Sequence, residues 1–412
     1  MATYRGHEVL RAKYNSPIAK KLRRRQPYQR PCVQGRKEFN ANSVVCCNTE
    51  FVTQIVRKEA SQVYDKIYGI IYGHCVGDAL GLLTENLSKE ESRKVFGSVC
   101  CKLELVHKKM IDDSHRRKWE LNDWTEESDH MILLLQSIVE NNGEIVPVDF
   151  AKRLMDWTEH GFPELGDDRG IGLCHVCKNV IGHPQFSEEP VKAAEIIWRK
   201  SERHCVTNSA LARSCVMGIH HYNALGKVIK NTMEMCSVTH AHPKCISSCV
   251  ALTTAVSTLL QNDEKYKTKK GEIDIDAIIE HSYQYASRCM INCTYQELKE
   301  LRHYLKATSL KELKLTEAGQ TSHTFKTLGA AFWALKQKNF RQAITDIIME
   351  GGDADANASV AGALLGCKLG VNEIPNSWIE TLKHRLWLDK IIDSYFHMME
   401  GGKFKPKVET TV

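Results

Sequence analysis

The chain lacks any run of 18 or more apolar residues, and its N-terminus has no apolar stretch of the length that a secretory signal needs. The first absence excludes a membrane span by composition, and the second argues against export. Cysteine is sparse for a disulfide-dependent fold, with 16 in 412 residues, and the adjacent pairs Cys46-Cys47 and Cys100-Cys101 cannot bridge easily. We therefore expect a reduced, intracellular protein.

Alternation of apolar and polar residues, the pattern of a half-buried strand, is almost missing after residue 55, and no fixed-period repeat occurs. Hydrophobic and charged contents of 42% and 26% are typical of a soluble globular protein. We expect one mostly helical domain in which residues 87–118 form a polar surface connection. The predicted helices after this connection include 147–160, 190–201, 207–221, 224–235, 241–261, 274–288, 296–307, 323–337, 340–349 and 378–399.

Basic charge is concentrated at the N-terminus. Residues 1–37 contain 11 Lys and Arg against Glu8 alone, whereas the remainder contains 45 basic and 49 acidic residues. The cluster Lys20-Lys-Leu-Arg-Arg-Arg25 fits a nuclear-import signal, a nucleic-acid phosphate contact, a mitochondrial presequence or a solvated arm without a receptor. We expect location in the cytoplasm or nucleus rather than the mitochondrion. The predicted organisation is a basic, disordered arm (1–52), a folded domain (53–402) and a flexible tail (403–412).

Two carboxylates near the C-terminus, Asp353 and Asp355, follow Gly351-Gly352 and precede an Ala/Gly/Leu-rich helical segment. Residues two apart point in nearly opposite directions in a regular helix, so these side chains can share an ion only from a loop or a first helical turn. Such a pair suits a hard cation such as magnesium, but Asp at a helix start also caps free N–H groups. The spacing alone leaves both interpretations open.

Glycine recurs every four residues from Gly69 to Gly81, which leaves one helix face without side chains. Such a face admits either a ligand or a closely crossing helix. Asp78 lies beside it, and Glu85 lies two turns farther on. A second set of oxygen donors, Thr125-Glu-Glu127, precedes an apolar helical run. The helix dipole favours acidic residues at a helix start without any metal. A second group of oxygen donors also makes a cation site more plausible, because a lone acidic pair rarely holds a cation.

Two pairs of soft ligands occur elsewhere in the chain. Cys174-His-Val-Cys177 has the spacing of half a zinc site, but no second CxxC or HxxxH half accompanies it. His240 and His242 also suggest zinc at a helix entrance, although no third ligand is obvious. We interpret the cysteines as a chance pair and the histidines as capping and turn residues.

Five separated motifs resemble the signatures of the ADP-ribosylglycohydrolase family, from about residue 64 to 372. They are Gly77-Asp-Ala-Leu-Gly81, Asp123-Trp-Thr-Glu-Glu-Ser128, Asn208-Ser-Ala-Leu-Ala-Arg213, Thr239-His240 and Gly351-Gly-Asp-Ala-Asp-Ala-Asn-Ala358. The resemblance implies an all-α orthogonal helical bundle with a cleft in which two magnesium ions position ADP-ribose. In such enzymes water attacks the anomeric carbon of the distal ribose and releases the modified acceptor.

The resemblance also implies roles for single residues. Glu85 matches a glutamate used catalytically in the branch that cleaves ADP-ribosyl-serine and polymer linkages. The implied metal ligands are Thr125, Glu126, Glu127, Asp353 and Asp355. The implied substrate contacts are Asp78, Gly170, Gly172, Asn208 and His240, with the two glycines at the phosphates and the histidine at the nucleotide. The predicted function is magnesium-dependent hydrolysis of an N- or O-glycosidic bond between ADP-ribose and a protein or small acceptor, by a monomer without a membrane partner.

Five positions depart from the family pattern. Two lie outside the implied metal ligands: Asn208-Ser-Ala replaces the more usual Asn-Gly-Ala, and Cys174 stands where another glycine is expected. Glu126 and Glu127 replace Asp-Asp, and each added methylene moves a carboxylate by more than ~1 Å, which is large against the narrow octahedral tolerance of magnesium. Ala356 supplies no ligand where the pattern has Thr. The alternatives are therefore a catalytically impaired relative that binds ADP-ribose or a partner, and a crystallin-like structural protein.

Overall fold

The computed structural model describes residues 62–98, 102–105, 111–202 and 204–402. The basic arm, the C-terminal tail and the start of the predicted folded domain lie outside the described residues. Within the described ranges the chain is helical, and its β pairing consists of two isolated bridges, Thr207 with His323 and Lys267 with Ile273. The all-α prediction is confirmed.

The α-helices of the described residues are α4 (Gln62–Gly81), α5 (Lys89–Phe96), α6 (Glu126–Glu140), α7 (Pro147–His160), α8 (His175–Ile181), α9 (Pro190–Lys200), α10 (Ser209–Arg213), α11 (Cys215–Ile219), α12 (Leu225–Ser237), α13 (Pro243–Gln261), α14 (Ile275–Arg288), α15 (Tyr295–Lys306), α16 (Leu310–Leu313), α17 (Thr324–Leu335), α18 (Phe340–Ile348), α19 (Ala354–Leu369), α20 (Asn376–Thr381) and α21 (Arg385–Met399). Short 3-10 helices are η2 (Arg116–Lys118), η3 (Pro163–Leu165), η4 (Glu264–Tyr266) and η5 (Val371–Glu373).

The structure corrects three predicted segments. The expected helix 207–221 is divided into α10 and α11, and the expected helix 378–399 is divided into α20 and α21. The connection 87–118 contains α5, which begins with a capping box. The Glu91 N–H donates to Ser88 Oγ at 3.2 Å, and the Ser88 N–H donates to Glu91 Oε2 at 2.8 Å. The Ser-x-x-Glu pattern was therefore a usable helix signal.

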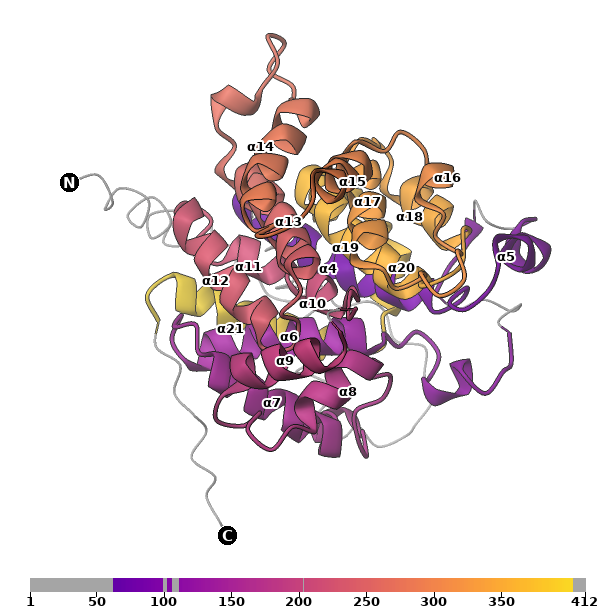
Figure 1. Ribbon diagram of the computed structural model, residues 1–412. Helices are drawn as coiled ribbons and strands as arrows, with labels where there is room; N and C mark the ends of the chain where they lie inside the picture. Colours follow the sequence, from indigo (N-terminus) through magenta and orange to yellow (C-terminus); the bar gives the residue numbers. More distant parts are fainter. Residues whose placement is uncertain (1–61, 99–101, 106–110, 203, 403–412) are drawn as a thin grey trace, which may run out of the picture.

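Helices α4 and α19 cross closely near the centre of the molecule (Figure 1). A Cβ on Gly73 would lie 2.2 Å from the Gly362 carbonyl oxygen, and a Cβ on Gly362 would lie 2.0 Å from the Gly73 carbonyl oxygen. The same antiparallel pairing places Gly69 against Gly366. Each glycine lowers helix propensity by about 1 kcal/mol relative to Ala, and close packing of the two backbones offsets that loss. The glycine spacing thus serves a helix crossing.

The crossing also brings two helix ends together. Because α4 and α19 run antiparallel, the C-terminal end of α4 lies beside the N-terminal end of α19, where a Cβ on Gly81 would lie 2.3 Å from the Cα of Asp355. The turn after α4 then bonds to the turn before α19. The Asn86 N–H donates to the Gly352 carbonyl at 2.7 Å, and the Gly352 N–H donates to the Leu87 carbonyl at 2.8 Å.

Glycine is required in this second turn. Gly351 and Gly352 have φ values of +75° and +71°, which side chains disfavour. A Cβ on Gly351 would also lie 2.2 Å from the Leu87 carbonyl oxygen. The Gly-Gly pair therefore allows the chain to reverse and begin α19 directly beside the end of α4.

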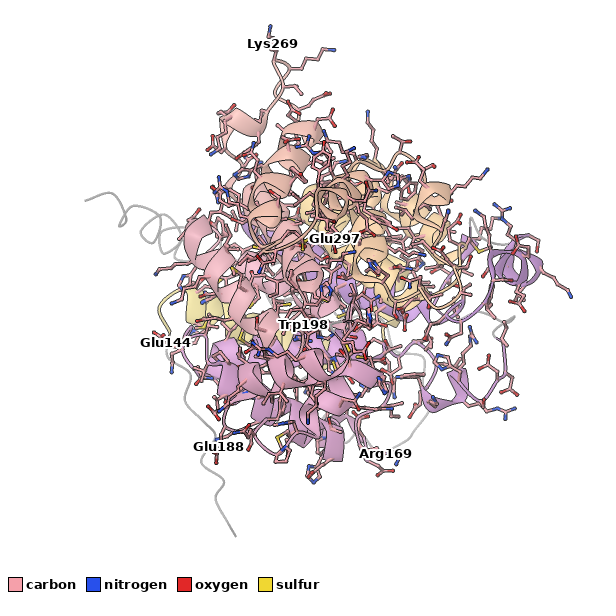
Figure 2. All side chains as sticks on the ribbon, in the orientation of Figure 1. Glu144, Arg169, Glu188, Trp198, Lys269 and Glu297 are labelled. Atoms are coloured by element: carbon pink, nitrogen blue, oxygen red, sulfur yellow. The ribbon has the colours of Figure 1, made fainter. Side chains whose placement is uncertain are left out.

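Helix α13 has the length and composition of a membrane-crossing helix, with a mean hydropathy of 1.3, but 83% of that window is buried inside the protein. It packs against α12, α14 and α17, as a core helix does. The Lys-rich turn after it projects away from the bundle, with Lys269 near its tip (Figure 2). The burial of α13 among other helices identifies it as part of the core.

Candidate functional site

Three carboxylates meet where α4 ends and α19 begins. Glu85, Asp353 and Asp355 each offer an oxygen atom, and these three atoms lie within 4.8 Å of one another. Asp353 occupies the position before α19 and Asp355 lies in its first turn, as convergence on one ion requires. The structure therefore brings the predicted catalytic glutamate together with two predicted metal ligands.

The predicted ligands Thr125, Glu126 and Glu127 begin α6, and Asp78 anchors this helix start from α4. The buried carboxylate of Asp78 accepts hydrogen bonds from the backbone N–H and the hydroxyl of Thr125, and from the same two groups of Ser128, at 2.6–3.2 Å. Burial raises the pKa of Asp78 to about 6 despite these donors. Asp78 thus positions α6, while its contact with substrate stays a prediction.

The two glutamates of α6 carry buried oxygens that are not satisfied by protein. Among the described residues, neither Glu126 Oε2 nor Glu127 Oε2 has a hydrogen-bond partner. The Glu126 carboxylate lies against the bare backbone of Gly172, where a Cβ would stand 1.8 Å from Oε2. A buried carboxylate oxygen without a donor costs free energy, so both atoms are suited to ligating a cation.

The pKa values of four carboxyl groups in this region are raised, because the groups are buried close to one another. Burial first, and then the charge of Glu85, raises the pKa of Asp353 to about 6 and the pKa of Asp355 well above its ordinary value. The pKa of Glu126 is raised mainly by burial and next by the charge of Glu85. The pKa of Glu127 is raised mainly by burial and next by the charge of Glu126. Divalent cations relieve this kind of repulsion, and an all-oxygen donor set is the one that magnesium prefers.

His115 is a neighbour of the cluster that sequence reasoning missed. Its Nε2 lies 2.5 Å from Glu85 Oε2. The buried side chain of Arg116 holds the adjoining turn by donating to the Leu83 carbonyl at 3.2 Å and to the Glu85 carbonyl at 2.5 Å. His115 belongs to the segment expected to be a surface connection, and no sequence spacing links it to Glu85, so only the packing identifies it.

Two predicted substrate residues hold structural hydrogen bonds. Asn208 Nδ2 donates to Thr327 Oγ1 at 2.8 Å and to Asp353 Oδ2 at 3.1 Å, which orients that carboxylate. The Gly170 N–H donates to the Trp157 carbonyl at 2.8 Å, and a Cβ on Gly170 would lie 2.7 Å from the Trp157 ring. The Gly170 N–H is therefore already hydrogen-bonded within the protein. The phosphate contacts of Gly170 and Gly172 stay predictions.

His240 lies with the two cysteines that were interpreted as a chance pair. One ligand atom from each of Cys174, Cys177 and His240 lies within 4.8 Å of the others, so that interpretation missed a spatial third partner. Capping is confirmed for His242, whose Nδ1 accepts the Lys244 N–H at 3.0 Å. A hydrogen bond from the Cys177 thiol is the main cause that lowers the pKa of Cys174 to about 6.

The sequence of this chain is similar to a known family and to two characterised relatives. A family model described as ADP-ribosylglycohydrolase matches residues 59–403. The ADP-ribosylarginine hydrolase Tri1 of Serratia proteamaculans is 21% identical over 345 residues, which cover 84% of this chain and 82% of the relative. The ADP-ribosyl-[dinitrogen reductase] glycohydrolase of Rhodospirillum rubrum is 22% identical over 78% of this chain and 91% of its own.

A solved structure titled ADP-ribosylglycohydrolase-related protein complex has a similar fold. It superposes with a TM-score of 0.57 at 18% identity, covering 82% of this chain and 99% of that chain. At this level of identity the likeness concerns the fold.

Proposed function

Because the chain belongs to the ADP-ribosylglycohydrolase family, we propose that it hydrolyses an N- or O-glycosidic bond joining ADP-ribose to a protein or a small acceptor. The observation that carries the proposal is the convergence of Glu85 with Asp353 and Asp355. The names of the two bacterial relatives, an arginine-linked and a dinitrogenase-reductase-linked ADP-ribosyl hydrolase, support the same class of substrate.

Magnesium is the proposed cofactor. The donor set fits it, because Glu85, Asp353 and Asp355 offer convergent carboxylate oxygens, and the charges of Glu126 and Glu127, whose Oε2 atoms are unsatisfied, act on the same group. Asp353 and Asp355 would hold the ions from α19, and the two glutamates would approach from α6. Bound cations would neutralise the pyrophosphate and lower the pKa of a coordinated water.

Glu85 is the proposed general base. Its carboxylate accepts the proton of the attacking water and stabilises the positive charge that the ribose ring develops as the glycosidic bond breaks. His115 contacts one carboxylate oxygen at 2.5 Å, and Arg116 holds the Glu85 backbone, so the base is fixed in orientation. This fixed placement matters because catalysis depends on aligned groups as well as on pKa.

The binding test is calorimetry of the purified chain with ADP-ribose, with and without magnesium. We expect magnesium-dependent binding, with a matching rise in melting temperature that Asp355→Ala abolishes. The matched control is Asp276→Ala, which removes an exposed acid from the first turn of α14 and should leave the binding unchanged. A melting shift that persists in Asp355→Ala would refute the proposed site.

A binding protein without hydrolytic activity is the second candidate, and one contact favours it. The Glu126 carboxylate occupies the space over Gly172, where a phosphate is predicted, and Ala356 brings no oxygen to the cluster. Release of ADP-ribose from ADP-ribosyl-arginine and ADP-ribosyl-serine peptides separates the candidates. Hydrolysis that Glu85→Gln removes without weakening ADP-ribose binding supports the enzyme, whereas binding without release by the unaltered protein supports the second candidate.

The altered ligands can be tested directly. We expect the combined substitution of Glu126→Asp, Glu127→Asp and Ala356→Thr to raise magnesium affinity severalfold, because it supplies the shorter carboxylates and the missing hydroxyl. Titration of magnesium by calorimetry measures the effect. An unchanged titration would indicate that no ion binds at these positions, and absence of both ADP-ribose binding and hydrolysis would favour a structural role.

A further inference from the structure

The second group of candidate ligands differs from the carboxylate cluster in its chemistry. Sγ of Cys174, Sγ of Cys177 and a ring nitrogen of His240 lie within 4.8 Å of one another. In a tetrahedral zinc site with bonds of about 2.0–2.3 Å, the ligand atoms lie roughly 3.4–3.8 Å apart. The three ligand atoms would therefore have to approach one another by at most about 1.4 Å to share one ion.

The backbone presents the two sulfurs from one helix turn. Cys174 is the residue before α8, and its Sγ accepts the Cys177 N–H at 3.3 Å, which holds both cysteines on the same face. Both are free thiols; Cys177 is buried and Cys174 is partly exposed. Cys174 is thus the most exposed of the three groups, whereas Cys177 and His240 are buried.

The imidazole is oriented as a metal ligand requires. His240 Nδ1 lies 2.7 Å from Thr239 Oγ1, which also accepts a hydrogen bond from the buried Arg213 at 2.7 Å. This contact holds the orientation of the ring, as outer-shell partners of metal-bound histidines do. The other nitrogen, Nε2, lies 2.7 Å from the hydroxyl of Thr207, a group that can rotate. Nε2 can therefore bind an ion once the Thr207 hydroxyl turns away.

We propose that Cys174, Cys177 and His240 form a zinc site, separate from the carboxylate cluster and with its fourth position open to water or another ligand. Two thiolates and one imidazole select a borderline-soft ion, whereas magnesium prefers carboxylate oxygens. Adjacent residues connect the two sites, because Thr207 contacts His240 Nε2 at 2.7 Å and Asn208 donates to Asp353 Oδ2 at 3.1 Å. The chain would hold a soft and a hard cation site side by side.

The test uses the full-length, reduced protein after removal of bound metal by a chelator. We titrate it with Zn²⁺, and with Co²⁺ as a spectroscopic probe of thiolate ligation and tetrahedral geometry. The doubly substituted Cys174→Ser, Cys177→Ser protein should lose one equivalent of tightly bound zinc and the thiolate-to-cobalt absorption. The matched control is Cys293→Ser, which removes a partly exposed thiol outside the cluster and should retain both.

Equal zinc stoichiometry and equal cobalt spectra in the two variants would overturn the proposal. X-ray absorption on the zinc form of the unaltered protein decides the matter if the double variant fails to fold. It should show two sulfurs at about 2.3 Å and one nitrogen at about 2.0–2.1 Å, whereas a shell of oxygen and nitrogen alone would refute the site. Asp355→Ala should keep this zinc ion while losing magnesium-dependent ADP-ribose binding, so failures of the two proposals are distinguishable.

Discussion

The same two helices, α4 and α19, build a close packing of two backbones and hold a crowded group of carboxylates at one end of it. Along the middle of the crossing, Gly73 and Gly362 bring bare backbones together without any polar conflict. At one end, Asp355 and its acidic neighbours are buried with raised pKa values, an arrangement that costs stability. The close packing of α4 and α19 therefore holds Asp355 and its acidic neighbours in positions that do not favour stability.

The largest expected effect comes from widening the crossing. In Gly73→Ala, the added Cβ would lie 2.2 Å from the Gly362 carbonyl oxygen, so the helices must separate along their length. We expect a loss of about 3 kcal/mol or more in the free energy of unfolding, measured by urea denaturation. The control, Gly226→Ala, places a methyl group in open space on α12 and should cost nothing. Equal stability of both variants would disprove the role given to the crossing.

The second largest expected effect is that of Asp355→Asn, which should stabilise the metal-free protein, whereas Gly73→Ala destabilises it. Asp355→Asn keeps the side-chain shape but removes one buried charge from the cluster, so the metal-free protein should gain about 1 kcal/mol. Magnesium-dependent ADP-ribose binding should weaken at least ~100-fold, because a metal ligand is lost. Denaturation and calorimetry on one preparation measure both quantities. A variant that is less stable without metal would contradict the idea that this end of the crossing is strained by charge.

The pH dependence of stability should reveal the same strain. Burial and the charge of Glu85 raise the pKa of Asp353 from 3.8 to about 6, so the folded state binds a proton that the unfolded state has released. This contribution to stability is fully present below about pH 4 and is lost as pH rises through 6. The melting temperature of the metal-free protein should therefore fall across this range, and less steeply in Asp353→Asn. Identical slopes would exclude Asp353 as the titrating group.

The smallest expected effect concerns His115. If its contact with Glu85 Oε2 orients the base, His115→Gln should lower kcat about tenfold and leave KM unchanged. The melting temperature should change little, because the side chain is partly exposed. His303→Gln removes an exposed histidine of α15 and serves as the control. An effect on KM alone would assign His115 to substrate binding instead.

Most of the helical architecture could be predicted, because helix periodicity, caps and turn residues act between neighbours in the chain. This local information includes the position of Asp353 before α19, that of Asp355 in its first turn, and the bare glycine face of α4. The capping box of α5 belonged to it too and was overlooked. The breaks between α10 and α11 and between α20 and α21 were not predicted. At the second break the Lys383 N–H donates to the Asn122 carbonyl at 3.1 Å, a partner that is distant in the sequence.

The sequence by itself determined the helices, the Gly-Gly reversal before α19 and the acidic residues at two helix starts, because each depends on residues within one or two turns. Only the tertiary structure decided which of these features meet. It paired the glycine face of α4 with α19, placed His115 at Glu85 and brought His240 to Cys174. Such contacts depend on how whole helices pack, and packing is set by the combined burial of many side chains rather than by spacing along the chain.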